Sequence, residues 1–494
     1  MEPNFQRLTA DEAAALIHNG QWVACSGFTP AGSVKSVTKA LGRRAKALQQ
    51  SGEDFKINLL AGASSGDCVD GELSRNHALA RRFPYQANKD LRLQINNGDV
   101  DYVDFHLSNF CQWVDQLPSL DWAVVEVADY TADGELVLTS SVGATPLFCQ
   151  KAQRIILEHN THHPKFIKGL HDIYAWQRPP ERKPILLEKV EDRLGEFVVK
   201  VDPRKIAGVV STCEPDNVLD FKEVNSTSQK IGEWVAEFFL QEMKCGRIPK
   251  SFLPVQSGVG NIANAVLKTM GEKNAIPPFA MYSEVVQNAV IDLMKQGRVY
   301  FASGTALAIT NDYMQEVYDN WNFYKQRLIL RSEDITNNPE IIRRIGLLSL
   351  NTAIEVDCFG HANSTHACGN NVINGIGGSG DFTRNAYISI FTLSSTNKNG
   401  HISGIVPFCS HVDHTEHDVQ VIITENGIAD LRGKSPMARA ECIVENCAHP
   451  DYKPLLRDYL KLTQQGHIRH DLTHAFAFHK AFLETGDMRN CRFD

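Results

Sequence analysis

The sequence predicts an α/β fold made of two related domains with mainly parallel sheets. Short apolar runs alternate with longer helix-like stretches along the 494 residues. That alternation is the signature of strand–helix–strand units, in which neighbouring strands are parallel. A strand, a glycine turn and a helix-like segment also follow one another in both halves of the chain, which indicates that the halves are related. The chain is long enough for two or three domains, each with its own core.

The clearest predicted strands are four short apolar runs. They lie at residues 21–25, 123–127, 206–210 and 419–423. Runs this short, set between turn residues and helix-like segments, favour strands over helices.

Glycine turns follow two of the predicted strands at comparable points of the two halves. The run 21–25 leads into the turn 26–32, and a helix-like segment with apolar Val34, Val37, Ala40 and Leu41 follows. The same order recurs at residues 257–260, followed by apolar Ile262, Ala265 and Val266. A second similarity pairs residues 124–127 with 421–425, since each strand-like run ends near an acid, Glu126 or Glu425.

The charged, proline-containing region from Gln177 to Arg204 is the predicted link between the domains. We therefore expect an N-terminal domain at residues 1–214 and a C-terminal domain at residues 215–494. Apolar residues at helical spacing between Ile231 and Met243 predict the helix that opens the second domain.

Charge and hydropathy exclude several classes of function. The formal net charge of −8 leaves no basic excess to neutralise phosphates, which argues against a nucleic-acid or anionic-membrane surface. A ligand that carries phosphate must therefore meet a local basic patch. No run of 18 apolar residues occurs, and residues 1–8 lack the basic and apolar segments of a secretory signal. We expect a cytoplasmic protein that makes no membrane contact.

The sequence predicts no metal centre. The twelve cysteines include no C-x-x-C pair, so we interpret them as reduced core thiols. Cys442, Cys447 and His449 have an unusual spacing for zinc and no fourth ligand nearby in the sequence. Residues 411–418 contain several histidines and acids, but their spacing fits no metal motif, which favours a structural loop.

Glu284 is the candidate nucleophile. It lies between two apolar stretches of the segment 277–287, about 25 residues after a glycine-rich turn. A carboxylate with an ordinary pKa of roughly 4.3 is ionised at neutral pH and attacks an activated acyl group without a general base. Two other interpretations remain open from the residues alone: a solvated surface acid, or a first-turn acid of a helix over 285–294.

Two glycine-rich turns are candidate sources of oxyanion donors. They are residues 256–261 and residues 374–381. Backbone N–H groups in such turns stabilise the negative oxygen that forms during acyl transfer. The first turn also fits an ordinary strand-to-helix connection, whereas four glycines within residues 375–380 indicate unusual dihedrals or close ligand approach. One carboxylate and two glycine turns together suggest acyl transfer. Lys398 is either a phosphate contact or a solvated loop lysine, and the residues alone favour the latter.

Eight segments in fixed order carry a resemblance to a known family. They are residues 26–29, 171–174, 256–266, 282–285, 363–365, 375–382, 424–433 and 447–452. Taken together they resemble the acetyl-CoA hydrolase/CoA-transferase family, most closely its class I succinyl-CoA:acetate CoA-transferase branch. The similarity covers nearly the whole chain.

The resemblance implies two open α/β domains of the CoA-transferase type with the active site between them. It implies that Glu284 becomes a glutamyl-CoA thioester and that the backbone amides of Val259 and Gly378 are the oxyanion donors. It also implies a homodimer without a tightly bound cofactor, which uses coenzyme A as substrate and covalent intermediate, with acyl-CoA and short-chain carboxylates as partners. The implied CoA contacts are Gly258, Val259, Gly260, Asn261, Ile262, Ile354, Asn374, Gly378 and Lys398. Asn337 and Glu425 occupy the positions of further active-site polar residues.

The sequence departs from the branch at residues 214–219, which lack the arginine that the resemblance leads us to expect. The identity of the carboxylic acids therefore stays open. Two alternatives to CoA transfer also stay open: an acyl-CoA hydrolase that uses the same residues with water as acceptor, and a non-catalytic CoA-binding protein.

Overall fold

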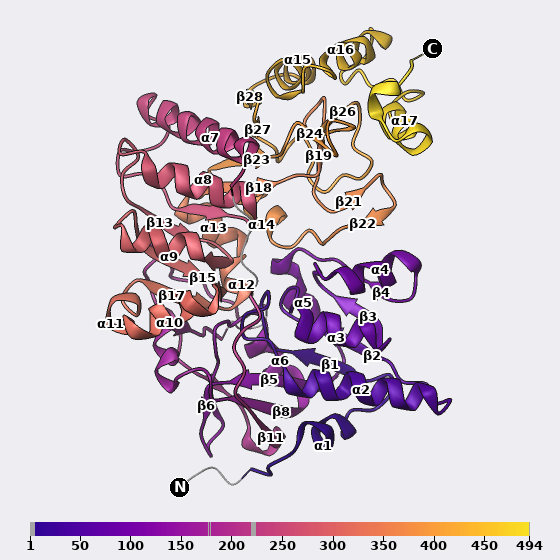
Figure 1. Cartoon of the computed structure of the whole chain (residues 1–494). Helices are drawn as coiled ribbons and strands as arrows, with labels where there is room; N and C mark the ends of the chain where they lie inside the picture. The colour runs from indigo at the N-terminus through magenta and orange to yellow at the C-terminus, as the bar shows by residue number, and fades with distance from the viewer. Residues whose placement is uncertain (1–4, 176, 178, 219–223, 494) are drawn as a thin grey trace.

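A computed structural model describes residues 5–175, 177, 179–218 and 224–493. Arg178, in the predicted link, and Leu219, at the end of the departing stretch, lie outside the described residues, as do residues 1–4 of the N-terminus. Strands of the first half, in indigo and purple, occupy the lower right of Figure 1. The second half forms the left side and the top of the same view.

A seven-stranded parallel sheet forms the centre of the first half. Neighbouring strands all run in the same direction, as expected for strand–helix–strand units. Their spatial order is β11 (Ile206–Thr212), β8 (Ala152–Asn160), β5 (Leu120–Val127), β1 (Trp22–Cys25), β2 (Ile57–Leu60), β3 (Leu79–Phe83) and β4 (Asp101–Tyr102). The helices of this half are α1 (Ala10–Ala15), α2 (Ser36–Gln50), α3 (Glu72–Arg75), α4 (Lys89–Asn97), α5 (Leu107–Gln116) and α6 (Thr145–Lys151).

A nine-stranded sheet forms the centre of the second half. Its neighbours are parallel except for the edge pair β27–β28. The order is β28 (Gly427–Asp430), β27 (Val421–Thr424), β23 (Ile388–Thr392), β18 (Leu348–Thr352), β12 (Val255–Ser257), β13 (Phe279–Tyr282), β15 (Val299–Gly304), β17 (Leu328–Arg331) and β9 (His171–Asp172). The strand β9 comes from the first half of the chain, so one edge of this sheet is contributed by an early segment.

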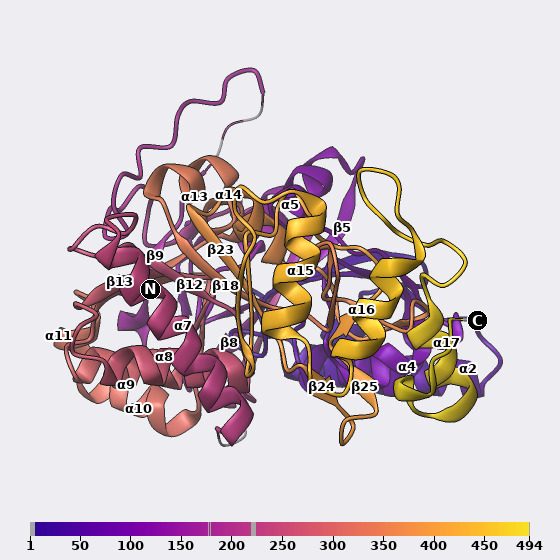
Figure 2. The same ribbon diagram turned by 90° about the horizontal axis from the view of Figure 1, so that it is seen from above.

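Helices of the second half lie in several groups, and α13 and α14 are together near the top of Figure 2. Figure 2 shows α7, α8 and α9 close together, whereas α15, α16 and α17 form a separate group near the viewer. Their bounds are α7 (Ser226–Lys244), α8 (Asn261–Glu272), α9 (Asn288–Lys295), α10 (Asn311–Asp319), α11 (Trp321–Tyr324), α12 (Glu333–Thr336), α13 (Pro339–Ile345), α14 (Ser379–Asn385), α15 (Pro436–Cys447), α16 (Lys453–Leu462) and α17 (Ala477–Thr485). Within the part of the chain that the structure describes, every helix is too short or too polar to cross a bilayer.

Small sheets lie outside the two large ones. β14 (Val285–Gln287) pairs with β16 (Ala306–Ala308) directly after the catalytic candidate. The others are β6 (Asp129–Tyr130) with β7 (Glu135–Val137) and β10 (Val199–Lys200); β19 (Glu355–Asp357) with β20 (Ala362–Asn363) and β26 (Ile405–Val406); β21 (His366–Ala367) with β22 (Asn371–Val372); and β24 (Thr396–Asn397) with β25 (Ile402–Ser403).

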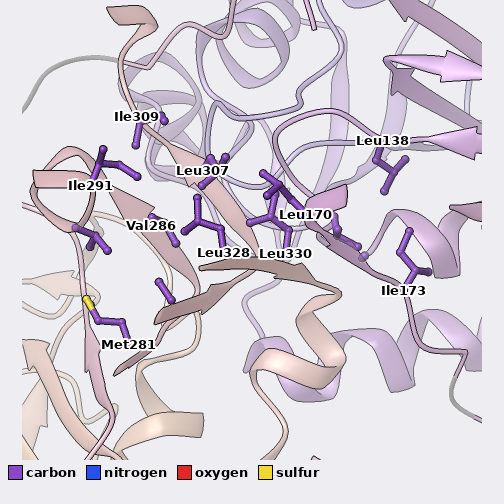
Figure 3. Packing of buried hydrophobic residues seen from close by; sticks show 14 of the residues in the cluster. Leu138, Leu170, Ile173, Met281, Val286, Ile291, Leu307, Ile309, Leu328 and Leu330 are labelled. Carbon is purple, nitrogen blue, oxygen red and sulfur yellow. The ribbon is translucent and has the colours of Figure 1, made fainter. Parts of the chain in front are cut away.

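The largest apolar core continues from one half into the other. It contains Phe110, Val125 and Leu157 around the first sheet, and Met281 and Ile390 from the second. Figure 3 shows part of this core, where Leu170 of the first half lies beside Leu328 and Leu330 of the second. Because burial of each such side chain contributes about 1.5–3 kcal/mol, the shared core holds the two halves firmly together.

The prediction of an α/β fold with mainly parallel sheets is confirmed, and the four apolar runs correspond to β1, β5, β11 and β27. The prediction of a helix over residues 285–294 is wrong for its first turn. Residues 285–287 form β14 and the helix α9 begins only at Asn288, so Glu284 precedes a strand and is not a first-turn acid. The boundary between residues 214 and 215 falls between β11 and α7 and stays a prediction, with β9 as an exception to a simple division.

Candidate active site

Glu284 lies at the carboxyl edge of the second sheet, two residues after β13 ends. Its backbone is fixed on both sides. The Ser283 hydroxyl donates to the carbonyl oxygen of Ser257 at 2.8 Å. The Glu284 carbonyl oxygen accepts hydrogen bonds from the amides of Thr305 at 2.7 Å and Ala306 at 3.1 Å. Carboxyl ends of parallel strands are where open α/β sheets bind ligands, so the sheet itself places Glu284 at a binding edge.

A cavity of about 160 Å³ opens between the two halves beside Glu284. The first half contributes mostly apolar side chains, and the second half contributes the glycine turns and polar groups. The lining comprises Phe28, Thr29, Ala63, Tyr85 and Leu107 from the first half, and Ser257, Gly258, Val259, Glu284, Val285, Asn351, Thr352, Ser364 and residues 374–379 from the second. Of the described residues that line the cavity, Glu284 carries the only carboxyl group.

Asn337, at the end of α12, contacts the Glu284 carboxylate directly. Its Nδ2 atom donates to Glu284 Oε1 at 2.8 Å and to Asp381 Oδ2 at 3.3 Å. Asn337 is completely buried and Asp381 is 5% exposed. The structure therefore brings together two of the predicted polar residues and adds Asp381, which the sequence had shown only as the end of the second glycine turn.

Burial raises the pKa of Glu284 to about 7, the hydrogen bond from Asn337 opposes this rise, and the charge of Asp381 adds to it. The expectation of an ordinary, fully ionised carboxylate is therefore wrong, because the half-buried group is partly shielded from bulk water. Burial also raises the pKa of Asp381 to about 7. Two neighbouring carboxyls with similar pKa values titrate as a pair, and an anionic nucleophile is fully formed only above neutral pH.

The second glycine turn packs against Glu284 so closely that only glycine fits. A Cβ atom on Gly378 would lie 2.0 Å from Glu284 Oε1 and 2.2 Å from Asn337 Nδ2. A Cβ on Gly375 would lie 2.4 Å from the Tyr102 hydroxyl. Such distances are below any contact that packed atoms adopt. These distances show that the turn needs glycine to pack against the protein's own side chains, and close approach of a ligand stays a prediction.

The first glycine turn is more open. The Gly258 amide donates to the carbonyl oxygen of Leu350 at 3.0 Å, and Gln287 Nε2 donates to the Gly258 carbonyl oxygen at 2.9 Å. Val259 lines the cavity and is 47% exposed. Gly260 has a φ of +113°, which side chains rarely tolerate. The turn thus presents Val259 to the cavity on a braced backbone.

The remaining predicted contacts do not line this cavity. Gly260, Asn261 and Ile262 lead into α8, and Ile354 follows β18 with its amide bonded to the Asn363 carbonyl oxygen at 2.7 Å. Lys398 is exposed in the β24–β25 hairpin, 5.1 Å from the ring centre of Phe482. Glu425 accepts a hydrogen bond from the Ser395 amide at 2.9 Å. Their roles in CoA binding stay predictions.

Residues 411–418 form a connecting loop beside the site. The Asp413 carboxylate accepts hydrogen bonds from the Ser364 amide at 2.6 Å and from the Thr365 hydroxyl at 2.9 Å. His414 Nε2 lies 3.2 Å from the Ser379 hydroxyl. These side chains therefore join the loop 363–365 to the second glycine turn, which supports the structural interpretation. Cys447, the buried member of the other candidate metal group, donates its thiol to the Ile422 carbonyl oxygen at 3.4 Å.

Several site residues escaped sequence reasoning. Tyr85 and Leu107 come from segments of the first half that carry no motif, and Ser108 reaches Asp381 across 273 residues of sequence. Only Asp381 had a usable signal, because it directly follows the glycine turn.

Comparisons with known proteins agree with this architecture. Residues 2–211 match the profile of the acetyl-CoA hydrolase/transferase N-terminal domain, and residues 314–460 match that of the C-terminal domain. The chain is 47% identical over 492 residues to propanoyl-CoA:succinate CoA transferase of Escherichia coli (strain K12), covering 99% of this chain and 100% of that protein. It is 43% identical over 487 residues to succinyl-CoA:acetate CoA-transferase of Clostridium kluyveri, covering 98% and 90%. It is 38% identical to acetyl-CoA hydrolase of Saccharomyces cerevisiae, covering 97% and 94%.

Solved structures show the same fold. RipA from Yersinia pestis superimposes with a TM-score of 0.70 at 22% identity, covering 92% of this chain and 97% of that one. A 4-hydroxybutyrate CoA-transferase from Porphyromonas gingivalis gives a TM-score of 0.63 at 20% identity, with the same coverage. At these identities the likeness concerns the fold alone.

Proposed function

The chain belongs to the acetyl-CoA hydrolase/transferase family, and from that premise we propose that it transfers coenzyme A between a short-chain acyl-CoA and a free carboxylic acid through a thioester on Glu284. One observation carries the proposal. Glu284 is the single carboxyl group among the described residues that line the cavity between the halves. Both glycine turns line the same cavity, so a carboxylate nucleophile and candidate backbone donors face one space.

The reaction proceeds in two halves. A Glu284 carboxylate oxygen attacks the thioester carbonyl of the acyl-CoA, and the CoA thiolate leaves, which gives a mixed anhydride. The thiolate then attacks the Glu284 carbonyl carbon and releases the first acid, leaving CoA on the enzyme as a thioester. A second carboxylate attacks this thioester and forms a new anhydride. The released CoA thiolate attacks the acyl carbonyl of that anhydride, which frees Glu284 and completes a ping-pong cycle.

We propose the backbone amides of Val259 and Gly378 as donors to the oxyanions of these steps. Both residues line the cavity, one on each glycine turn. A single oxyanion donor lowers a barrier by roughly 2.7–4 kcal/mol, so the placement of both turns matters for rate. The close packing of Gly378 on Glu284 supports the role of the second turn.

Hydrolysis is the second candidate function, since several relatives at 38–40% identity are named acetyl-CoA hydrolases. Water would replace the second carboxylate as acceptor at the same thioester. An assay with acetyl-CoA separates the candidates: transfer requires succinate or propionate, hydrolysis releases free CoA without either acid, and a non-catalytic binding protein does neither. We propose acetate, propionate and succinate as the acids to test first, because these acyl groups occur in the names of the most similar relatives.

The decisive experiment is detection of the covalent intermediate. Incubation with an acyl-CoA and no acceptor should add CoA to the peptide that contains Glu284, and Glu284→Gln should abolish both the adduct and transfer. Glu237→Gln, the same change at an exposed carboxyl of α7, is the matched control and should keep the adduct. Addition of only the acyl group, or an adduct on a cysteine, would contradict the mechanism.

We also propose that the protein is a cytoplasmic homodimer that uses coenzyme A without another bound cofactor. The resemblance to the CoA-transferase branch is the basis for proposing the dimer. Light scattering of the purified protein tests the oligomeric state.

A further inference from the structure

A chain of hydrogen bonds leads from the nucleophile across the boundary between the halves. Asn337 Nδ2 donates to Glu284 Oε1 at 2.8 Å and to Asp381 Oδ2 at 3.3 Å. Asp381 in turn accepts two bonds from Ser108 of α5, one from its hydroxyl to Oδ1 at 2.5 Å and one from its amide to Oδ2 at 3.0 Å. Ser108 belongs to the first half, whereas the other three residues belong to the second.

This chain of hydrogen bonds fixes the orientation of the Asn337 side-chain amide. Its NH₂ group faces two carboxylates, while its Oδ1 atom has no hydrogen-bond partner among the described residues. A flipped amide would point its oxygen at both carboxylates, which is electrostatically unfavourable. Asp381 therefore helps to decide which end of Asn337 meets Glu284.

We propose that Asp381 and Ser108 are positioning residues for the nucleophile. Asp381 orients the Asn337 amide, and Ser108 holds Asp381 from the opposite half, so that docking of the two halves aligns Glu284 for attack. This inference rests on the proposed function, because it assigns the chain of hydrogen bonds a role in the rate at which Glu284 reacts.

Burial strengthens the hydrogen bonds of this chain. Asn337, Asp381 and Ser108 are exposed by only 0%, 5% and 8%. Hydrogen bonds to charged acceptors away from water contribute more than those at the surface. The isosteric change Asp381→Asn would place a second NH₂ group or a neutral oxygen against Asn337, so the amide loses one of the two carboxylates that orient it.

The experiment compares kcat and KM of four variants at about pH 8.5, where Glu284 and Asp381 are both ionised. Among the described residues, Tyr85 and Glu333 carry titratable groups that interact with Glu284, and His106 packs against Gly380 beside Asp381; all three are unchanged in every variant. Asp381→Asn should lower kcat by about tenfold to a hundredfold, with KM for acyl-CoA within about threefold. Ser108→Ala, which keeps the backbone bond, should lower kcat by about threefold to tenfold.

The double variant tests whether Ser108 acts through Asp381. Because both residues belong to one chain of hydrogen bonds, Ser108→Ala in the Asp381→Asn background should change kcat by less than about twofold. Tyr318→Phe is the matched control, since it removes a different hydrogen bond between the halves, which joins the Tyr318 hydroxyl and His163 Nδ1 at 2.7 Å. We expect its kcat within about twofold of wild type.

Three results would overturn the proposal: an unchanged kcat in Asp381→Asn, multiplicative effects in the double variant, or an equal loss in Tyr318→Phe. If Asp381→Asn fails to fold, the comparison of Ser108→Ala with Tyr318→Phe decides, since only the former should slow catalysis. The wild-type CoA adduct separates this inference from the proposed function. Absence of the adduct in wild type refutes the function, whereas a normal adduct in wild type that forms equally fast in the variants refutes only the positioning.

Discussion

The two glycine-rich turns beside Glu284 need glycine for different reasons. In the first turn, a Cβ on Gly260 would meet nothing within 4 Å, but its φ of +113° belongs to glycine. In the second, Gly375, Gly378 and Gly380 have no φ in the range that favours glycine, yet a Cβ on each would come within 2.4 Å of a neighbouring atom. The first turn needs backbone freedom, whereas the second needs space at three of its glycines and backbone freedom only at Gly377, whose φ is +55°.

The difference explains why the two turns tolerate change unequally. A strained dihedral contributes a fixed penalty of about 1–3 kcal/mol wherever it occurs. A steric clash moves the neighbouring groups, and in the second turn these groups are the nucleophile and the residues that join the two halves. Substitutions in the first turn should therefore affect stability or affinity, whereas those in the second should affect chemistry at Gly378 and the contact between the halves at Gly375.

The largest effect is expected from Gly378→Ala. The added methyl group would overlap the Glu284 carboxylate and the Asn337 amide, so both must move. We expect kcat to fall by on the order of a hundredfold or more, the scale of losing one oxyanion donor, while the protein remains folded. Steady-state kinetics with circular dichroism checks this. Near-normal turnover would show that the comparison is mistaken and that the turn has only a structural role.

The pH profile tests the electrostatic consequence of this close packing. Because burial raises the pKa of Glu284 to about 7, the reactive anion disappears as pH falls. Below this pKa, kcat/KM should drop by about tenfold per pH unit, and it should level off above about pH 8. A profile that stays flat down to about pH 5 would mean that the carboxyl is well hydrated and that the turn does not exclude water.

Gly375→Ala should weaken the contact between the halves. Its Cβ would lie 2.4 Å from the Tyr102 hydroxyl and 2.5 Å from Asp104 Oδ1, both in the first half. Overpacking of this kind destabilises by about 1–3 kcal/mol. Chemical denaturation measures the free energy of unfolding. An unchanged value would contradict a role of Gly375 in the contact between the halves.

The smallest effects are expected in the first turn. Gly260→Ala should lower the free energy of unfolding by about 1–2 kcal/mol through backbone strain, with kcat nearly unchanged. Gly258→Ala is its control, because its Cβ would meet only the Leu350 carbonyl oxygen at 3.7 Å, an ordinary contact. A loss of kcat in Gly260→Ala as large as in Gly378→Ala would remove the distinction between the turns.

Local patterns in the sequence predicted much of the fold. The runs at 123–127 and 206–210 lie within β5 and β11, and the helix predicted at 231–243 lies within α7. The glycine turns and Glu284 were also recognisable locally. The bond between Ser108 and Asp381 was not, since it joins residues 273 positions apart. The raised pKa of Glu284 was also hidden, because the residues that pack on its carboxylate, Gly378 and Asn337, are distant in sequence and leave no mark on the residues next to it.

The edge strand β9 limits the order in which the two sheets can form during synthesis of the chain. His171 and Asp172 are synthesised early, but they pair with Leu330 and Arg331 of β17, and the fully buried Arg331 side chain binds Asp172. During translation this strand stays without its sheet until 159 further residues have emerged. Contacts across such long stretches slow folding, because the intervening chain must close as a loop first. All strands of the first sheet lie within residues 22–212, so that sheet can form before β17 is available to pair with β9.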